Sequence, residues 1–171
     1  MSTNNIDNSN YGRQRNGKKE FKEILKEQNR IASSWLIHYG ERKLEHEQQR
    51  EELVKKPELH VKNTFRSKPT ETLAIKLAEH DDNDTARWLW TIEEVKRILA
   101  KNKSKSTLLK LRQECQLYSP PYGGRPSWIA PVQIRFGELT DWCPPEQTLR
   151  NMWSDIVALT VRLAYLKKCK I

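Results

Sequence analysis

EQTLRNMWSDIVALTVRLAYL, residues 146–166, carries the clearest helical pattern in the chain. Its apolar side chains recur in alternating steps of three and four, which places them on one face of an α-helix. They are Leu149, Met152, Ile156, Leu159, Leu163 and Leu166, with Trp153, Val157 and Thr160 widening the stripe. We expect this stripe to pack against other helices, because an amphipathic helix must bury its apolar face.

Two more helices are expected in the middle of the chain. One covers residues 85–101, with Asp84 as its cap, and its apolar residues repeat at i, i+3, i+4 and i+7. They are Trp88, Leu89, Ile92, Val95 and Leu99. The next helix is capped by Ser104 or Ser106 and includes Leu117. Alternation with a period of two is almost absent, so the predicted fold class is all-α.

The N-terminal part of the chain is more polar. Residues 1–18 are rich in Asn and Ser, and we expect them to form a flexible basic arm. Residues 19–56 predict one long charged helix or a pair of helices, with a break near Gly40. Residues 57–70 contain two prolines and no period, which is typical of a linker. Residues 71–171 then form a helical domain, interrupted by a turn-rich loop at 118–131.

Composition restricts the classes of function. The 171 residues are 36% hydrophobic, against about 45–50% in an average globular chain, so the core must be small. Lys and Arg number 31 and Asp and Glu 22, which gives a formal net charge of +9. This excess favours a polyanionic partner, nucleic acid first and an anionic membrane surface second. No apolar stretch of about 18 residues and no secretory signal occur, so we expect a cytoplasmic protein without a membrane span.

Motifs for catalysis or metal binding are missing from the sequence. The four histidines and three cysteines form no CxxC, HxxxH or HExxH pattern. The run Asp82-Asn83-Asp84 lacks the glycine and the distal glutamate of a calcium loop, so helix capping explains it better. The odd number of widely spaced cysteines favours free thiols in a reducing compartment. We expect no metal, no cofactor and no catalytic residue.

Basic residues are concentrated between Val95 and Gln113, where no acidic residue interrupts them. The run comprises Lys96, Arg97, Lys101, Lys103, Lys105, Lys110 and Arg112. A solvated helix face explains most runs of this kind, and a surface that contacts phosphates is the alternative. On the second interpretation, the residues that anchor a nucleic-acid backbone are Lys103, Lys105, Lys110 and Arg135.

The last two predicted helices fit a helix-turn-helix, which needs a support helix, a tight turn and a second helix with a polar face. The first covers residues 132–139 and is expected to bury Val132, Ile134, Phe136 and Leu139. Residues 140–145 (TDWCPP) form the turn, and Pro144 or Pro145 opens the second helix. The outer face of that helix carries the side chains expected to contact double-stranded DNA: Gln147, Thr148, Arg150, Asn151 and Ser154. Gln, Asn and Arg are suited to bidentate contacts with base edges in the major groove.

Four segments of the C-terminal part carry a resemblance to a known family. They are PTETLAIKLAEH (69–80), RWLWTIEEVKRIL (87–99), LLKLRQECQLY (108–118) and EQTLRNMWSDIVALTVRLAYL (146–166). Together they resemble the RinA/ArpU-type phage transcriptional regulators, whose C-terminal half is like region 4 of a bacterial sigma factor. In the recognition-helix motif of that family, Thr148, Leu149 and Trp153 would occupy the motif positions, with Gln147, Arg150 and Asn151 as exposed readers. The resemblance implies a phage or prophage activator that binds a promoter and recruits host RNA polymerase in the bacterial cytoplasm for late genes.

Three interpretations of function remain open at this point. The first is a DNA-binding regulator: an all-α helical bundle with a C-terminal helix-turn-helix and a long charged N-terminal helix. In it, residues 19–56 serve homo-oligomerisation or contact with the polymerase. The second is a viral DNA-packaging or assembly subunit of the small terminase kind, which would form a closed ring of many copies. The third is a helical interaction protein that does not bind DNA and pairs with its partner through residues 19–56.

Overall fold

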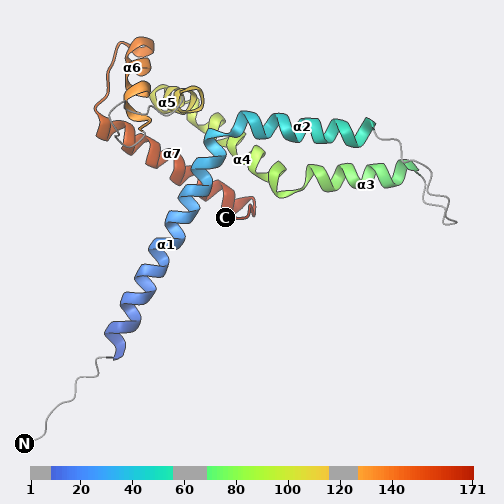
Figure 1. Ribbon diagram of the computed structural model, residues 1–171, viewed down its shortest axis with the longest axis horizontal. Helices are drawn as coiled ribbons and strands as arrows, with labels where there is room; N and C mark the ends of the chain where they lie inside the picture. Colours follow the sequence, from blue (N-terminus) through green and yellow to red (C-terminus); the bar gives the residue numbers. More distant parts are fainter. Residues whose placement is uncertain (1–8, 56–68, 116–126) are drawn as a thin grey trace, which may run out of the picture.

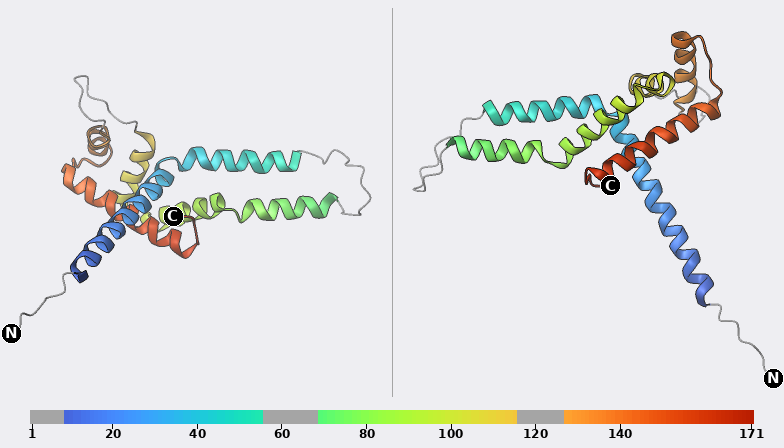
Figure 2. Two further views of the ribbon diagram at one scale, coloured as in Figure 1. Left: turned by 60° about the horizontal axis from the view of Figure 1, so that its bottom comes forward. Right: turned by 180° about the vertical axis from the view of Figure 1, so that it is seen from behind.

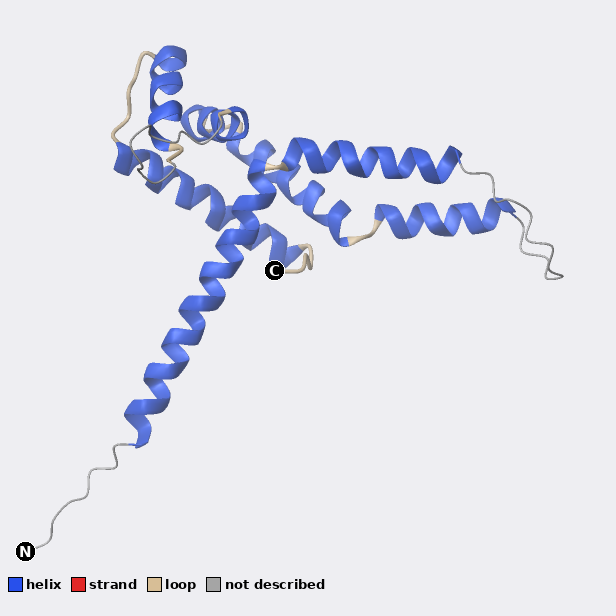
Figure 3. Ribbon diagram, in the orientation of Figure 1, coloured by secondary structure: helices blue, strands red, loops and turns tan. Residues whose placement is uncertain are grey.

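The computed structural model describes residues 9–55, 69–115 and 127–171, and the side-chain surroundings of residues 19–55, 71–115 and 127–171. Within these ranges the chain forms helices and no β-strand, which confirms the all-α class (Figure 3). The helices are α1 (Ser9–Ile37), α2 (Tyr39–Lys55), α3 (Pro69–Asp81), α4 (Asp84–Leu99), α5 (Lys103–Glu114), α6 (Ile129–Thr140) and α7 (Glu146–Leu166). None of these helices is long and apolar enough to cross a membrane.

Several predictions fall wholly or partly on other residues. The first eight residues of the expected arm lie outside the described part of the chain, as does His60. The same holds for residues 57–68 of the expected linker and for residues 118–126 of the turn-rich loop. Leu117 is also outside, because the described part of α5 ends at Glu114 with Cys115 as its C-terminal cap.

The core lies where α7 crosses α1, α4 and α5 (Figure 1). The stripe predicted for α7 takes part in it: Leu149 and Ile156 are fully buried, and Leu163 is half-buried. Helix α4 contributes all five of the apolar residues predicted for its buried face, namely Trp88, Leu89, Ile92, Val95 and Leu99. Leu166, in the last turn of α7, is 77% exposed, so the stripe runs past the end of the core.

Residues 19–55 form parts of two helices rather than one. The chain bends at His38, between α1 and α2, two residues before the expected break at Gly40. Contacts across the bend hold it: the Arg42 guanidinium lies 4.0 Å from the centre of the Trp35 ring and donates to Ser34 Oγ at 2.9 Å. A cation over an aromatic ring and a side-chain hydrogen bond therefore stabilise the change of direction.

Helix α1 begins at Ser9, well before the expected boundary at residue 19. The predicted arm is therefore too long, because residues 9–18 are helical. A helix anchored by buried Ala32 and Leu36 extends backwards at little cost, since each added residue gains a hydrogen bond without a new nucleus. The N-terminal half of α1 points away from the bundle (Figure 2).

The caps of α4 and α5 differ from those predicted. Asn83, not Asp84, caps α4 by accepting a hydrogen bond from the N–H of Ala86 at 2.8 Å. Asp84 instead accepts from the N–H of Lys170 at 2.7 Å and ties the C-terminus to α4. Asn102, rather than Ser104 or Ser106, caps α5. Asn, Asp and Ser are near-equal caps, so their order along the chain alone does not select one of them.

Helix α6 begins at Ile129, earlier than residue 132, and presents a different buried face from the one predicted. Ile129, Val132 and Phe136 are buried at i, i+3 and i+7. Ile134 and Leu139 were expected to be buried and are 64% and 59% exposed. Ile134 lies two residues from both Val132 and Phe136, a spacing that suits one face of a strand and not one face of a helix.

Candidate nucleic-acid interface

The turn between α6 and α7 is fixed by hydrogen bonds and by its backbone. Asp141 ends α6 in the left-handed conformation, with φ at 53°, and its N–H donates to the carbonyl of Gly137. The Thr140 hydroxyl donates to the carbonyl of Phe136 at 2.7 Å. Further along, the Gln133 amide donates to the carbonyl of Pro144 at 2.8 Å, which joins the middle of α6 to the end of the turn. Asp is among the few residues other than glycine that tolerate this left-handed region.

The inner side of this helix pair is apolar. Phe136 of α6 and Leu149 of α7 are fully buried, and Trp142 from the turn meets the Phe136 ring edge-on at 5.8 Å. Helix α5 supports both helices from behind with the fully buried Leu108 and Leu111. This packing sets the direction in which α7 presents its outer face.

The outer face at the start of α7 is polar and accessible. Gln147, Arg150, Asn151 and Ser154 are exposed, and Thr148 is half-buried. The Gln147 amide donates to the Asn151 side-chain oxygen at 2.8 Å, and Arg150 pairs with Glu146 one turn earlier. Both contacts join residues four apart, so the side chains lie along the surface of the helix. Their donors and acceptors face solvent, since all four side chains of these two pairs are exposed.

A groove of about 270 Å³ runs beside this face. Arg150 and Ser154 form one wall with Trp153 and Val157, and Asn29 and Ser33 of α1 contribute to the other. Trp128, at the start of α6, completes the lining. The sequence pattern did not place α1 next to the candidate recognition helix, because helical periodicity says which face is buried and not which helix covers it.

The predicted phosphate anchors are at the surface, and most of them already have an anionic partner. Lys105 bridges α5 and α7 through a 2.7 Å contact between its Nζ and Asp155. Lys110 lies 3.9 Å from Glu114, and Arg135 lies 3.2 Å from Glu138. Lys103, at the first position of α5, is exposed. The pairs of Lys110 and Arg135 are exposed and therefore weak, so phosphates can replace their carboxylates at small cost, whereas the Lys105 side chain is only 26% exposed.

The basic run between Val95 and Gln113 is not one continuous surface. Lys96 is half-buried, with its Nζ 3.7 Å from the centre of the Tyr39 ring, and Arg97 pairs with Glu94 on its own helix. Arg112 points inwards and is 8% exposed. Lys96 and Arg112 are therefore turned to structural contacts, which the linear sequence did not reveal, whereas Arg97 stays at the surface.

Arg112 lies between two tryptophan rings. Its guanidinium carbon is 4.5 Å from the centre of the Trp128 ring and 5.0 Å from that of Trp153. Burial lowers the pKa of Arg112 to about 10, and the guanidinium remains charged at neutral pH. The cation joins α5, the start of α6 and α7 through its contacts with both rings.

The described residues were also considered for metal binding and for nucleophilic cysteines. No group of three or more His, Cys, Asp or Glu side chains is placed to hold a metal ion in the described ranges. Burial raises the pKa of the Cys115 and Cys169 thiols, which keeps both protonated at neutral pH and weakens them as nucleophiles. No protein-family model, curated protein or solved structure matches this chain.

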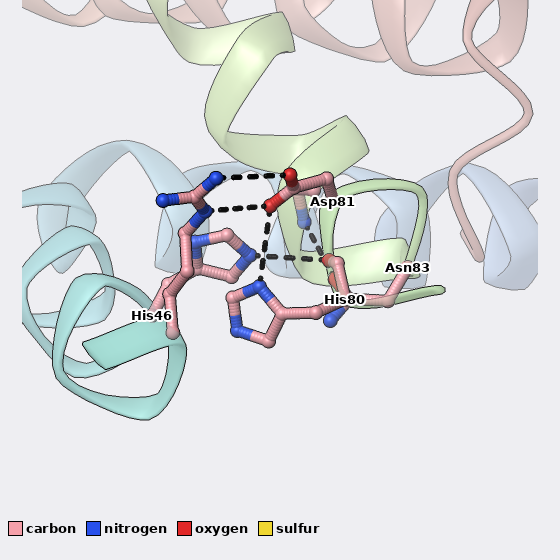
Figure 4. A network of polar contacts seen from close by, with 6 residues as sticks. His46, His80, Asp81 and Asn83 are labelled. Atoms are coloured by element: carbon pink, nitrogen blue, oxygen red, sulfur yellow. Dashed lines mark hydrogen bonds and ion pairs between the residues drawn. The ribbon is translucent and has the colours of Figure 1, made fainter. Parts of the chain in front are cut away.

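Two histidines that lie far apart in the sequence meet between α2 and α3. The rings of His46 and His80 are 4.0 Å apart at their centres (Figure 4). His80 Nδ1 contacts Asp81 at 3.4 Å, and the Arg50 guanidinium reaches the same carboxylate at 3.1 Å. With a contact of 3.4 Å from the ring Nε2 of His46 to the backbone carbonyl of His80, this network fastens α2 to the end of α3.

Proposed function

We propose that the chain binds double-stranded DNA through the helix-turn-helix formed by α6 and α7, and that it acts as a transcriptional regulator. The observation that carries this proposal is the exposed polar face at the start of α7, held in place by a fixed turn and a buried apolar side. A recognition helix needs this combination, because its N-terminal residues must reach base edges while its rear packs on the support helix.

In this proposal Gln147, Arg150 and Asn151 contact base edges, with Thr148 and Ser154 beside them. An Arg side chain makes two hydrogen bonds to guanine, and Gln or Asn makes two to adenine. Both pairs on the helix surface, Gln147 with Asn151 and Arg150 with Glu146, would open to meet the bases. Lys103, Lys105, Lys110 and Arg135 would contact phosphates and set the register on the duplex.

The regulatory part of the proposal rests on the resemblance to RinA/ArpU-type regulators. On that basis, the chain would act on a phage or prophage promoter and contact the host RNA polymerase. The α2–α3 hairpin projects from the bundle on the side away from α6 (Figure 1). It is therefore available to a protein partner while α7 occupies the major groove.

A selection from a randomised duplex library, followed by a gel shift, tests the proposal. We expect the wild-type chain to enrich one sequence. Arg150→Ala should lose about 10- to 100-fold in affinity for that sequence, as expected for one bidentate base contact, and keep its affinity for random duplex. Lys105→Ala should weaken binding to every sequence alike and lower the salt slope by about 0.9.

Arg87→Ala is the matched control, because Arg87 lies on α4 in an exposed pair with Asp82. It should bind as the wild type does. Absence of any duplex binding at low salt, or equal sequence preference in the wild type and Arg150→Ala, would overturn the proposal.

A further inference from the structure

The exposed part of α1 sorts its side chains into three faces. Lys19, Lys22 and Lys26 follow one another at i, i+3 and i+7, so they lie on one face of the helix. Glu20, Glu23 and Glu27 repeat the same spacing one residue later and form a separate acidic face. The remaining face is apolar and carries Phe21, Ile24 and Leu25. Each charged face therefore has one sign.

The basic face leads directly to the candidate recognition helix. Asn29 follows Lys22 by seven residues and Lys26 by three, and Ser33 follows Lys26 by seven. Asn29 and Ser33 therefore share the face of the lysines, and both line the groove beside Arg150 and Ser154. The lysines thus extend, along α1, the side of the molecule on which α7 exposes its polar face.

The charges of these lysines are available to a ligand. Lys19, Lys22 and Lys26 are all exposed, and within the described part of the chain none of them forms an ion pair. By contrast, Lys105, Lys110 and Arg135 each face a carboxylate. An anion that meets the basic face of α1 therefore does not have to displace an existing partner.

We propose that Lys19, Lys22 and Lys26 contact the phosphate backbone of the same DNA duplex that α7 reads. This inference rests on the proposed function and adds a second contact region to it. From residue 19 to residue 33 the helix covers about 21 Å, at a rise of about 1.5 Å per residue. At about 3.4 Å per base pair, this length corresponds to about six base pairs beside the recognition site.

The acidic face fixes how α1 can lie on the duplex. Glu20, Glu23 and Glu27 would be repelled by phosphates, and Glu27 is paired with Arg30. Approach with the lysine face is therefore favoured over approach with the adjoining acidic face, and the lysine face is also the one that continues into the groove. A patch of mixed charge would not select an orientation in this way.

The test compares two triple variants of the full chain on the sequence enriched by selection, embedded in a long duplex. One variant replaces Lys19, Lys22 and Lys26 with Gln, and its control replaces Glu20, Glu23 and Glu27 with Gln. Both sets of substitutions lie on exposed positions of one helix, and circular dichroism checks that the helix content is kept. Fluorescence anisotropy gives the dissociation constant between 50 and 200 mM salt.

We expect the lysine variant to keep its preference for the enriched sequence and to lose about 2.7 from its salt slope, at about 0.9 per phosphate contact. Over that salt range its affinity should fall about 40-fold less than that of the wild type. The glutamate variant should keep the wild-type slope and bind no more weakly. On a duplex trimmed to the α7 site, the wild type and the lysine variant should become alike.

Three outcomes would overturn the inference. A lysine variant with the wild-type salt slope shows that α1 does not touch the duplex, and if Arg150→Ala still loses sequence preference, the proposed function stands without it. An equal loss in both triple variants shows a general effect on α1. Finally, the lysine variant can be tested on vesicles of anionic lipid. If it binds DNA as the wild type does but no longer binds the vesicles, the lysine face contacts a membrane surface instead of DNA.

Discussion

Two helix pairs of the molecule, α6–α7 and α2–α3, are held by different forces. In the α6–α7 pair, Phe136, Val132 and Leu149 are fully buried. In the α2–α3 pair, Leu44, Val54 and Ile75 are each more than half exposed. Polar contacts take the place of a core there: the adjacent, tilted rings of His46 and His80, and the pair formed by Arg50 and Asp81. One pair is an extension of the core, and the other is fastened at a few points.

Under the proposed function, the two helix pairs would have different tasks. A helix that reads bases must be held in a fixed position, because a small displacement removes a bidentate contact. A hairpin with few buried apolar contacts has low local stability and adapts more readily to a partner. Leu44, Val54 and Ile75 leave apolar side chains exposed on this hairpin.

The largest effect is expected for Phe136→Ala. Removal of this fully buried ring should lower the free energy of unfolding by about 3–5 kcal/mol. The matched change in the hairpin, Leu44→Ala, should alter it by less than about 0.5 kcal/mol, because Leu44 is 56% exposed. Urea denaturation followed by circular dichroism measures both, and similar losses in the two variants would contradict the comparison.

A smaller and more local effect is expected for His80→Ala. The variant loses the ring contact with His46, which is worth about 0.5–1.5 kcal/mol for an aromatic pair. Amide hydrogen exchange should become faster in α2 and α3 and stay unchanged in α6 and α7. His38→Ala, at an exposed position next to Glu41, is the control and should leave both pairs protected. Faster exchange across α6 and α7 in the His80 variant would show that the two regions are coupled.

The smallest effect is expected for Arg50→Gln, and it should depend on pH. The hydrogen bond from Arg50 is the main cause that holds the pKa of Asp81 below its usual range. A carboxyl group whose pKa is lowered in the folded state stabilises the fold above its unfolded pKa, and this stabilisation is lost as the pH falls through the lowered value. The melting temperatures of the wild type and Arg50→Gln should therefore differ slightly at neutral pH and converge in acid. A difference that grows on acidification would contradict this account.

The sequence was most informative where one apolar face repeats over several turns. All of the predicted positions on α4 are buried, and the α7 stripe lies in the core up to its last turn. It was least informative where the apolar residues of a short segment fit both the period of a strand and the period of a helix. In α6, residues 132, 134 and 136 alternate, and only the structure shows that Ile129 completes the buried face in place of Ile134.

At the candidate site, too, the sequence predicts which face of a helix is exposed but not which residues from other elements lie against it. The polar face of α7 could be predicted, because it is what remains when the apolar stripe is buried. The burial of Arg112 could not be predicted, because the tryptophan rings that cover it come from residues 128 and 153, far from it in the sequence. The contribution of Asn29 and Ser33 was missed for a similar reason, although the spacing of Lys19, Lys22 and Lys26 was already visible in the sequence.

The stack of Trp128, Arg112 and Trp153 gives the molecule an optical probe of its own. Indole emission responds to a nearby positive charge and to water, and both tryptophans border the groove next to Arg150. A ligand that settles in this groove changes the surroundings of both fluorophores at once. Occupancy of this side of α7 would therefore change the emission of two of the six tryptophans, without an added label.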